Sequence, residues 1–350
     1  MAYSSIAKPT DYFNTVLYTG NTSGQSITGV GFQPDFLWIK SRSASYQHSL
    51  RNVIAGSTKT LRSNGTNAEA TQSDSVTSFD SDGFTLGADS SSFVNENSAT
   101  YASWNWLAGG SASSNSNGSI TSSVSANTTA GFSVVSYTGT GSTATIGHGL
   151  GSAPLITLIK QRSSGGTGSG NWNFITYQID GSSDELTLNG TGAKADRSIT
   201  APTSSVFSVD TSDERNDSGQ TYICYCFANK KGYSKFGSYT GNGNADGTFV
   251  YTGFKPAWLI VKSTSTNGWA MFDNKRNGFN VDNDQLIANT SGAETDGATD
   301  LYIDLLSNGF KFRNTATDKN SSGQTYIYMA FAENPFVGND SGTAVPVVAR

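Results

Sequence analysis

The stretch Gly31-Phe-Gln-Pro-Asp-Phe-Leu-Trp-Ile-Lys40 decides the fold, because its pattern recurs twice further along the chain. The copies share a proline and, six residues later, a lysine: Pro34 and Lys40, Pro154 and Lys160, Pro256 and Lys262. Between them lie apolar runs at 35–39, 155–159 and 257–261. A short continuous apolar run after a proline predicts a strand buried on both faces. We expect each lysine to mark where its strand emerges into solvent.

Two other motifs recur in step with this stretch. Tyr-Thr-Gly precedes each copy, and an aromatic run follows each one at 101–106, 222–227 and 326–331. The near-constant spacing predicts three homologous units of about 100 residues each. Residues 120–126, inside the linker, are an alternative first strand of repeat 2. The predicted boundaries are 1–13 for an N-terminal arm, 14–108 for repeat 1, 109–130 for a Gly/Ser-rich linker, 131–229 for repeat 2, 230–336 for repeat 3 and 337–350 for a C-terminal tail.

Composition favours a packed β-rich protein. Among 350 residues, 39 are glycine and only 14% are charged, which fits neither a disordered chain nor a coiled coil. Apolar and polar residues tend to alternate at 132–137, as in a strand with one dry and one wet face. Asn-Gly and Asp-Gly pairs separate such runs and favour hairpin turns. We therefore predict an all-β protein of three tandem antiparallel β-sandwich domains, each with its own core and able to fold alone.

Charge and hydropathy exclude several classes of partner. The formal net charge is −5, so there is no basic excess for a nucleic-acid backbone, and no apolar run is long enough for membrane insertion. The N-terminal residues carry no secretion signal. Cys224 and Cys226 are the only cysteines, and His48 and His148 the only histidines; neither histidine lies in a Cys/His cluster. We predict that the cysteines fill the core and bind no metal.

No residue pattern in the sequence points to catalysis. Asp80-Ser-Asp82-Gly83 begins like a calcium loop but is better interpreted as a hairpin turn. The acidic pairs at 184–185 and 213–214 are adjacent, so on a strand their side chains face opposite ways. A Gly-x-Ser-x-Gly elbow is absent. We predict a non-enzymatic protein without catalytic, cofactor-binding or metal-binding residues; a glycan hydrolase remains as an alternative.

Trp172 and Trp269 are the candidate ligand-binding residues. They follow the lysine at equivalent places in repeats 2 and 3, among amide and small side chains. An aromatic platform flanked by amides would suit a sugar. The alternative is that both tryptophans begin the next strand and cover the edge of the core.

Three stretches resemble a family of repeated domains in virion structural proteins of marine tailed bacteriophages. They are residues 31–42, Ser-Phe-Asp-Ser-Asp-Gly-Phe-Thr-Leu-Gly at 78–87, and Tyr-Ile-Tyr-Met-Ala-Phe-Ala-Glu-Asn-Pro-Phe at 326–336. The resemblance implies lectin-like, concanavalin-type jelly-roll domains. It also implies assembly in the host cytoplasm, a place on the exterior of the virion, and other virion proteins as partners. It brings no catalytic residues with it.

Two roles follow as expectations from that resemblance. One is a tail-fibre or spike component that adsorbs to the host surface, with a cell-surface glycan as candidate ligand. The other is capsid decoration, including a head fibre. The chain has neither heptads nor a hexapeptide repeat, which argues against a long fibre shaft. We expect a homo-oligomer, with a trimer favoured, anchored through a short extended segment at 3–12 or 344–348 by strand addition.

Overall fold

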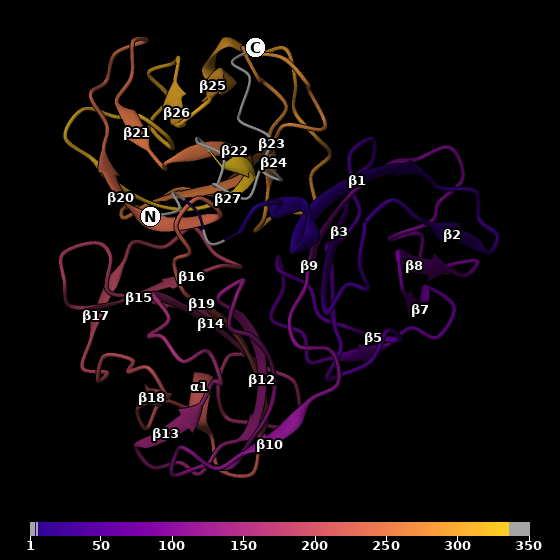
Figure 1. The fold of residues 1–350 in the computed structure, drawn as a ribbon, viewed down its shortest axis with the longest axis vertical. Helices are drawn as coiled ribbons and strands as arrows, with labels where there is room; N and C mark the ends of the chain where they lie inside the picture. The colour runs from indigo at the N-terminus through magenta and orange to yellow at the C-terminus, as the bar shows by residue number, and fades with distance from the viewer. Residues whose placement is uncertain (1–3, 5, 336–350) are drawn as a thin grey trace.

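The computed structural model of the chain describes residue 4 and residues 6–335, and it is all-β with antiparallel sheets (Figure 1). The predicted tail and residue 336 lie outside the described residues. In and before repeat 1 the elements are η1 (Pro9–Asp11), β1 (Phe13–Thr19), β2 (Gln25–Ile27), β3 (Phe36–Ser41), β4 (Ser49–Asn52), β5 (Lys59–Thr60), β6 (Ala70–Thr71), β7 (Val76–Asp80), β8 (Gly83–Leu86) and β9 (Thr100–Trp106).

The middle of the chain, including the predicted linker, contains β10 (Ser113–Asn115), β11 (Ser122–Asn127), β12 (Phe132–Thr138), β13 (Ala144–Gly147), β14 (Ile156–Gln161), β15 (Trp172–Thr176), β16 (Ser183–Thr187), β17 (Ala195–Arg197), β18 (Val206–Val209), α1 (Asp213–Asn216) and β19 (Thr221–Phe227). Repeat 3 contains β20 (Ser234–Thr240), β21 (Phe249–Tyr251), β22 (Phe254–Ser263), β23 (Trp269–Asp273), β24 (Leu286–Ile287), η2 (Thr299–Leu301), β25 (Ile303–Leu306), β26 (Gly309–Phe312) and β27 (Thr325–Pro335).

Each repeat is built on one large sheet with the same strand order. The order is β1-β9-β3-β4 in repeat 1, and β12-β19-β14-β15 and β20-β27-β22-β23 recur within the sheets of the other two. The tyrosine of each Tyr-Thr-Gly motif faces the first tyrosine of the following aromatic run, and the two rings stack. Their centroids lie 5.1, 5.2 and 5.0 Å apart in repeats 1, 2 and 3. Two of the recurring motifs therefore form one structural unit in each repeat.

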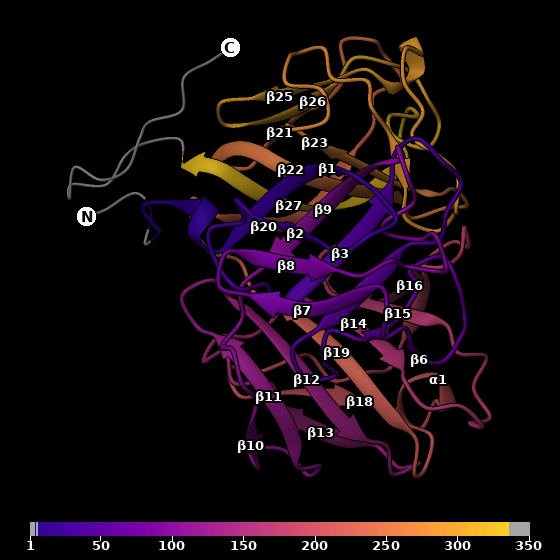
Figure 2. The same cartoon turned by 90° about the vertical axis from the view of Figure 1, so that its right-hand side faces the viewer.

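A smaller sheet lies over the outer face of each large sheet. The small sheets are β2-β8-β7, β13-β18 and β21-β26-β25. Viewed from the side of repeat 1, β7 and β8 lie in front of β3 and β9 (Figure 2). Between the layers, each repeat has a separate outer core, in which Leu37 and Ile39 of repeat 1 pack against Phe84. Repeats 2 and 3 have equivalent outer cores.

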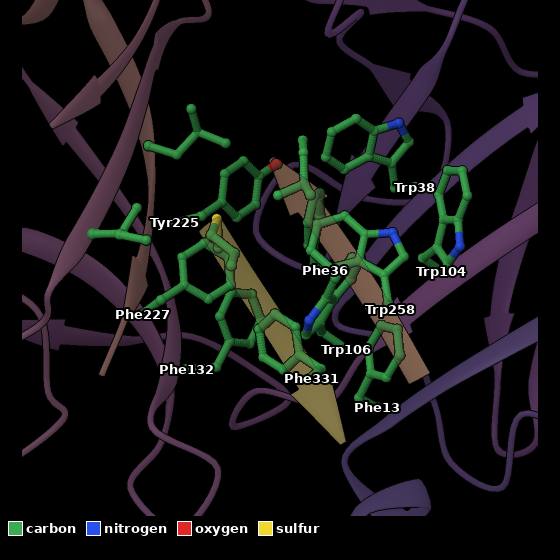
Figure 3. Close-up of a cluster of buried hydrophobic side chains, with 14 of the residues drawn as sticks. Phe13, Phe36, Trp38, Trp104, Trp106, Phe132, Tyr225, Phe227, Trp258 and Phe331 are labelled. Atoms are coloured by element: carbon green, nitrogen blue, oxygen red, sulfur yellow. The ribbon is translucent and has the colours of Figure 1, made fainter. Parts of the chain in front are cut away.

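The inner faces of the three large sheets pack against one another in one shared core. Repeat 1 contributes Trp38 and Trp106, repeat 2 contributes Phe227, and repeat 3 contributes Trp258 and Phe331, all in one cluster (Figure 3). The Trp106 and Trp258 ring centroids are 5.4 Å apart. In Figure 1 the repeats form three lobes around this centre. The expectation that each repeat has a core of its own is therefore correct only for its outer face.

Burial follows from this arrangement. The apolar runs after the prolines form β3, β14 and the central part of β22, and every residue of β3 and β14 is buried, as the sequence predicts. The prediction of a wet face for residues 132–137 is wrong: β12 is buried on both sides over most of its length. An outer core covers one side and the shared core covers the other.

The segment predicted as a linker is ordered. Its β11 pairs with β12 from Ser123↔Ser136 to Asn127↔Phe132, and β10 pairs with β11 in turn. The alternative, a first strand of repeat 2 at 120–126, describes this region better than a flexible linker does. Its glycines and serines are held because the segment continues the large sheet of repeat 2.

The described part of the N-terminal arm packs against repeat 3. Ile6 is buried in the shared core, and the hydroxyl of Ser4 donates to the carbonyl of Lys231 at 3.0 Å. The rings of Phe13 and Phe331 stack at 5.3 Å. These contacts join the first described residues of the chain to its last repeat. The proposed anchor at 344–348 lies outside the described residues, as does Tyr3.

Candidate functional site

The two tryptophans proposed as a glycan platform are buried. Trp172 is 0% exposed and Trp269 is 1% exposed, so neither can offer a ring to a ligand. The indole N–H of Trp172 donates to the carbonyl of Arg62 at 2.8 Å, and that of Trp269 donates to the carbonyl of Thr187 at 2.9 Å. The glycan prediction for these residues is wrong. The alternative interpretation describes their place: each begins a strand and is covered by the neighbouring repeat.

His48 has the equivalent place in repeat 1. Trp172 pairs with Lys160 and Trp269 with Lys262, and His48 directly precedes the first residue of β4. Its Nε2 lies 3.2 Å from the carbonyl of Ile287, and its Nδ1 accepts the Trp38 indole N–H at 2.8 Å. Nε2 therefore carries the proton of the neutral ring.

These three contacts close a ring of repeats. A side-chain N–H of repeat 2 donates a hydrogen bond to a carbonyl of repeat 1, one of repeat 3 donates to repeat 2, and one of repeat 1 donates to repeat 3. We call the three contact regions seams. Each seam also has a backbone hydrogen bond at an equivalent place. The N–H groups of Glu69, Lys194 and Glu294 donate to the carbonyls of Arg162, Thr264 and Arg42, respectively. The chain thus forms a closed, approximately threefold arrangement from its own three repeats.

The seams differ in their ion pairs. Arg162 pairs with Glu69 at 2.9 Å and Arg42 pairs with Glu294 at 2.8 Å. At the third seam, between repeats 2 and 3, threonine replaces the arginine and Lys194 replaces the glutamate. Lys194 instead binds acidic residues of its own repeat.

The lysines of the repeated motif are buried, contrary to the expectation that they emerge into solvent. Lys40 and Lys262 are 0% exposed and Lys160 is 1% exposed. Each ammonium donates to the carbonyl of the residue that follows it. It also donates to a second carbonyl: Ala44 for Lys40, Thr66 for Lys160 and Ser265 for Lys262. Burial lowers the pKa of each lysine to about 8. Pro34, Pro154 and Pro256 are also buried, just before or near the start of the apolar strands.

One acidic cluster has the spacing of a cation site. Single carboxylate oxygens of Asp180, Asp184 and Asp196 lie within 4.8 Å of one another. The ammonium of Lys194 lies between them, 2.7, 2.6 and 2.6 Å from the three carboxylates. These contacts raise the pKa of Lys194. The chain's own lysine therefore supplies the positive charge that a metal ion would bring.

The other residues with reactive side chains also have structural partners. His148 is buried, and its Nε2 lies 3.1 Å from the carbonyl of Thr203. Cys224 and Cys226 are free and buried in the outer core of repeat 2, with sulfur atoms 3.6 Å apart.

One surface groove carries exposed aromatic side chains. It has a volume of about 480 Å³ and lies between β20 and β21, at the margin of repeat 3 away from repeat 1 (Figure 1). Phe249 is 43% exposed and Tyr251 is 48% exposed on β21. The Lys235 ammonium donates to the carbonyl of Tyr251 at 2.7 Å and lies over its ring. Tyr328 and Gln178 also line the groove.

Sequence reasoning missed this groove, although aligning the three copies gives a signal. Val250 pairs with Phe310 in the same way that Ile27 pairs with Phe84 and Ile146 with Phe207. The residues on either side are therefore equivalent. They are Ser26 and Thr28 in repeat 1, Thr145 and Gly147 in repeat 2, and Phe249 and Tyr251 in repeat 3. Only repeat 3 has aromatic side chains there.

Comparisons with known proteins give a family and no function. No helix among the described residues is long and apolar enough to cross a membrane. No curated protein and no solved structure matches the chain significantly. One family model, a domain of unknown function (DUF7483), matches residues 8–335, a range that includes repeats 1 and 2, the segment between them and all but the last residue of repeat 3. The closed ring of three repeats lies within that one match, and the chain belongs to the DUF7483 family.

Proposed function

We propose that this protein is a non-enzymatic structural component of the exterior of a tailed-bacteriophage virion, of tail-fibre or spike type, that serves in adsorption to the host. The observation that carries the proposal is the closed ring. Its three repeats share one aromatic core, so a repeat cannot move away without exposing that core. Such a body suits a component that bears mechanical load. The buried and bonded state of His48, His148 and Cys224 supports a role without catalysis.

Two further observations support the place and the finer fold. The sequence resemblance points to virion structural proteins, and other virion proteins are the proposed partners. The two-layer arrangement of each repeat supports the lectin-like jelly-roll assignment as a proposal. Adsorption through a glycan platform at Trp172 and Trp269 is no longer part of it, because both side chains are buried.

Capsid decoration is the second candidate, and the approximate threefold arrangement favours it. A body with three similar faces can make three similar contacts at a threefold position of a lattice. A single chain would then do what a homotrimer does elsewhere. The proposed homo-oligomer is tested separately, by measuring the mass of the purified protein in solution against 36.8 kDa for one chain.

Cryo-electron microscopy of intact particles, with an antibody fragment against this chain as a marker, tests the proposal. Marker density at the tail tip or baseplate is the expected result and supports adsorption. Density over the capsid lattice would replace adsorption with decoration. Absence of the chain from purified particles would refute both.

A further inference from the structure

Repeat 2 shows what can cover the margin of this fold. There, β11 pairs with β12, and just before it Ile120 forms a parallel bridge with Ile146 of β13. Residues 120–127 thus run antiparallel to the large sheet and parallel to the small sheet, and they join the two margins. Ile120 and Val124 enter the outer core of repeat 2.

Hydrogen bonds hold this covering segment in place. The N–H of Ile120 donates to the carbonyl of Thr145 at 3.0 Å, and the hydroxyl of Ser122 donates to the carbonyl of Gly147 at 2.8 Å. The equivalent carbonyls in repeat 3 belong to Phe249 and Tyr251. Lys235 donates to the second of them, so its ammonium takes the place of the serine hydroxyl.

Among the residues that the structure describes, the same margin is open at Ser238 in repeat 3, while Asn229 and Lys230 cover it near the start of β20. β20 is the last strand of its sheet and β21 is the last strand of the small sheet, within the residues that the structure describes. The N–H of Phe236 points away from β27, because it donates to the side chain of Asn229 at 2.8 Å. Alternation along a strand gives Ser238 the same outward direction. Its N–H is therefore placed to pair with another strand.

The three copies treat this margin differently. Among the described residues, repeat 1 leaves it open, since β1 and β2 are the last strands of their sheets, but presents the small polar side chains of Ser26 and Thr28. Repeat 2 covers its margin with β11, and in the described part of repeat 3 the margin is open at Ser238, beside the exposed side chains of Phe249 and Tyr251. An open strand edge beside exposed aromatic side chains is an unfavourable surface for a protein to leave in water.

The floor of the groove also differs from that of repeat 2. Register places Gly237 where repeat 2 has Val135, and Tyr328 where it has Cys224. Tyr328 is 3% exposed and lines the groove, and no described residue accepts or donates a hydrogen bond at its hydroxyl. In repeat 2 the residue that faces Val135 is Val124. A serine at that place on an incoming strand would lie beside the Tyr328 hydroxyl.

We propose that the groove between β20 and β21 binds an extended segment of a partner polypeptide, which adds to β20 as an antiparallel strand in the way that β11 adds to β12. The segment carries an aliphatic residue at the place of Ile120 and a serine four residues later, at the place of Val124. Its backbone forms a hydrogen bond with the N–H of Ser238, and its aliphatic side chain packs beside Phe249 and Tyr251. The hydroxyl of its serine forms a hydrogen bond with the hydroxyl of Tyr328. This binding activity goes beyond the proposed function and does not depend on the protein being part of a virion.

The test uses the full chain and two labelled peptides. The first peptide has the sequence of residues 119–125, which stops short of the place that Lys230 takes beside Ser234, and the second has the same sequence with Val124→Ser. Fluorescence anisotropy should show that both bind and that the serine peptide binds about 3 to 10 times more tightly, as one added hydrogen bond predicts. Tyr328→Phe in the protein should abolish this difference and leave the affinity of the first peptide nearly unchanged.

Protein variants locate the site. Ser238→Pro removes the outward N–H from an edge strand, where proline is tolerated, and should lower the affinity for both peptides at least tenfold. Phe249→Ser with Tyr251→Thr, which restores the side chains of repeat 1, should weaken both as well. Phe279→Ser is the matched control, because this aromatic side chain is 74% exposed but does not line the groove.

Three results would overturn the proposal. The first is that neither peptide binds, and the second is binding that Ser238→Pro leaves unchanged. The third is binding that appears only after residues 337–350 are removed, which would assign the groove to the chain's own tail.

Discussion

Replacing Trp258 by alanine should destabilise the closed arrangement of all three repeats and not repeat 3 alone. Trp258 is 2% exposed, and its ring lies 5.4 Å from that of Trp106 and 6.0 Å from that of Phe331. Burying about 200 Å² of tryptophan contributes about 5 kcal/mol at about 25 cal/mol per Å². Its Nε1 has no hydrogen-bond partner among the described residues, so alanine also removes an unsatisfied donor that costs about 1 to 2 kcal/mol. The expected loss is therefore about 3 to 4 kcal/mol of the free energy of unfolding.

Urea titration followed by tryptophan fluorescence and far-UV circular dichroism measures this loss. Hydrogen exchange then shows where it falls: Trp258→Ala should increase exchange in β3 and β14, which belong to the other two repeats. Phe272→Ala is the control, because Phe272 lies in the outer core of repeat 3 and its loss should increase exchange there. A loss below about 1 kcal/mol, or faster exchange confined to repeat 3, would refute the shared core as a source of stability.

Four other outcomes are expected. Residues 109–229 produced alone should bind a hydrophobic dye and melt without a cooperative transition, because the inner face of their sheet is exposed; a sharp thermal transition would contradict this. Trp172→Phe and Trp269→Phe should each lower the free energy of unfolding by about 1 to 2 kcal/mol, because each leaves a carbonyl at a seam without its hydrogen-bond donor. Equal urea midpoints for the variants and the parent protein would contradict this expectation. Burial and the charge of Lys40 lower the pKa of His48 to about 3, so below about pH 6.5 the unfolded state binds the proton first. The free energy of unfolding therefore decreases as the pH decreases, by at most about 1.4 kcal/mol per pH unit. His48→Gln should remove this part of the pH dependence between pH 6.5 and 4, as measured by urea titrations. Burial lowers the pKa of Lys262 to about 8, so from pH 8 to 9.5 the folded state loses this proton first and stability rises with increasing pH. Lys40 and Lys160 titrate in the same range, so Lys262→Met should remove only the share of this rise that Lys262 contributes, and an unchanged slope would place its ammonium in solvent.

The strands were predictable from the sequence, but what covers them was not. The apolar run of β3 correctly indicates burial on both faces, since each face of a strand carries alternate side chains. The run does not say that Leu37 packs inside its own repeat while Trp38 packs in the core shared by all three repeats, against Trp258 of repeat 3. Alternation within one copy records burial and not the identity of the neighbour.

The predictions of where the candidate site residues lie were wrong for a related reason. A lysine at the end of an apolar run usually reaches solvent, yet Lys40 ends among backbone carbonyls that only the folded loop brings together. Trp172 has polar neighbours in sequence, which suggested a surface, but repeat 1 covers it in space. The groove of repeat 3 was accessible to reasoning, because Phe249 and Tyr251 replace Ser26 and Thr28 in aligned copies.

The closed ring has a consequence for how this protein diversifies. In a homotrimer every substitution appears three times, and the assembly dissociates on dilution because its stability depends on protomer concentration. Joining three copies in one chain makes association intramolecular and removes that dependence. It also lets each copy change alone. One seam lacks the ion pair that the other two have, and one margin carries aromatic side chains that the other two lack, while all three copies share the same core. A fused trimer can thus acquire a single off-axis feature that a symmetric one would have to display three times.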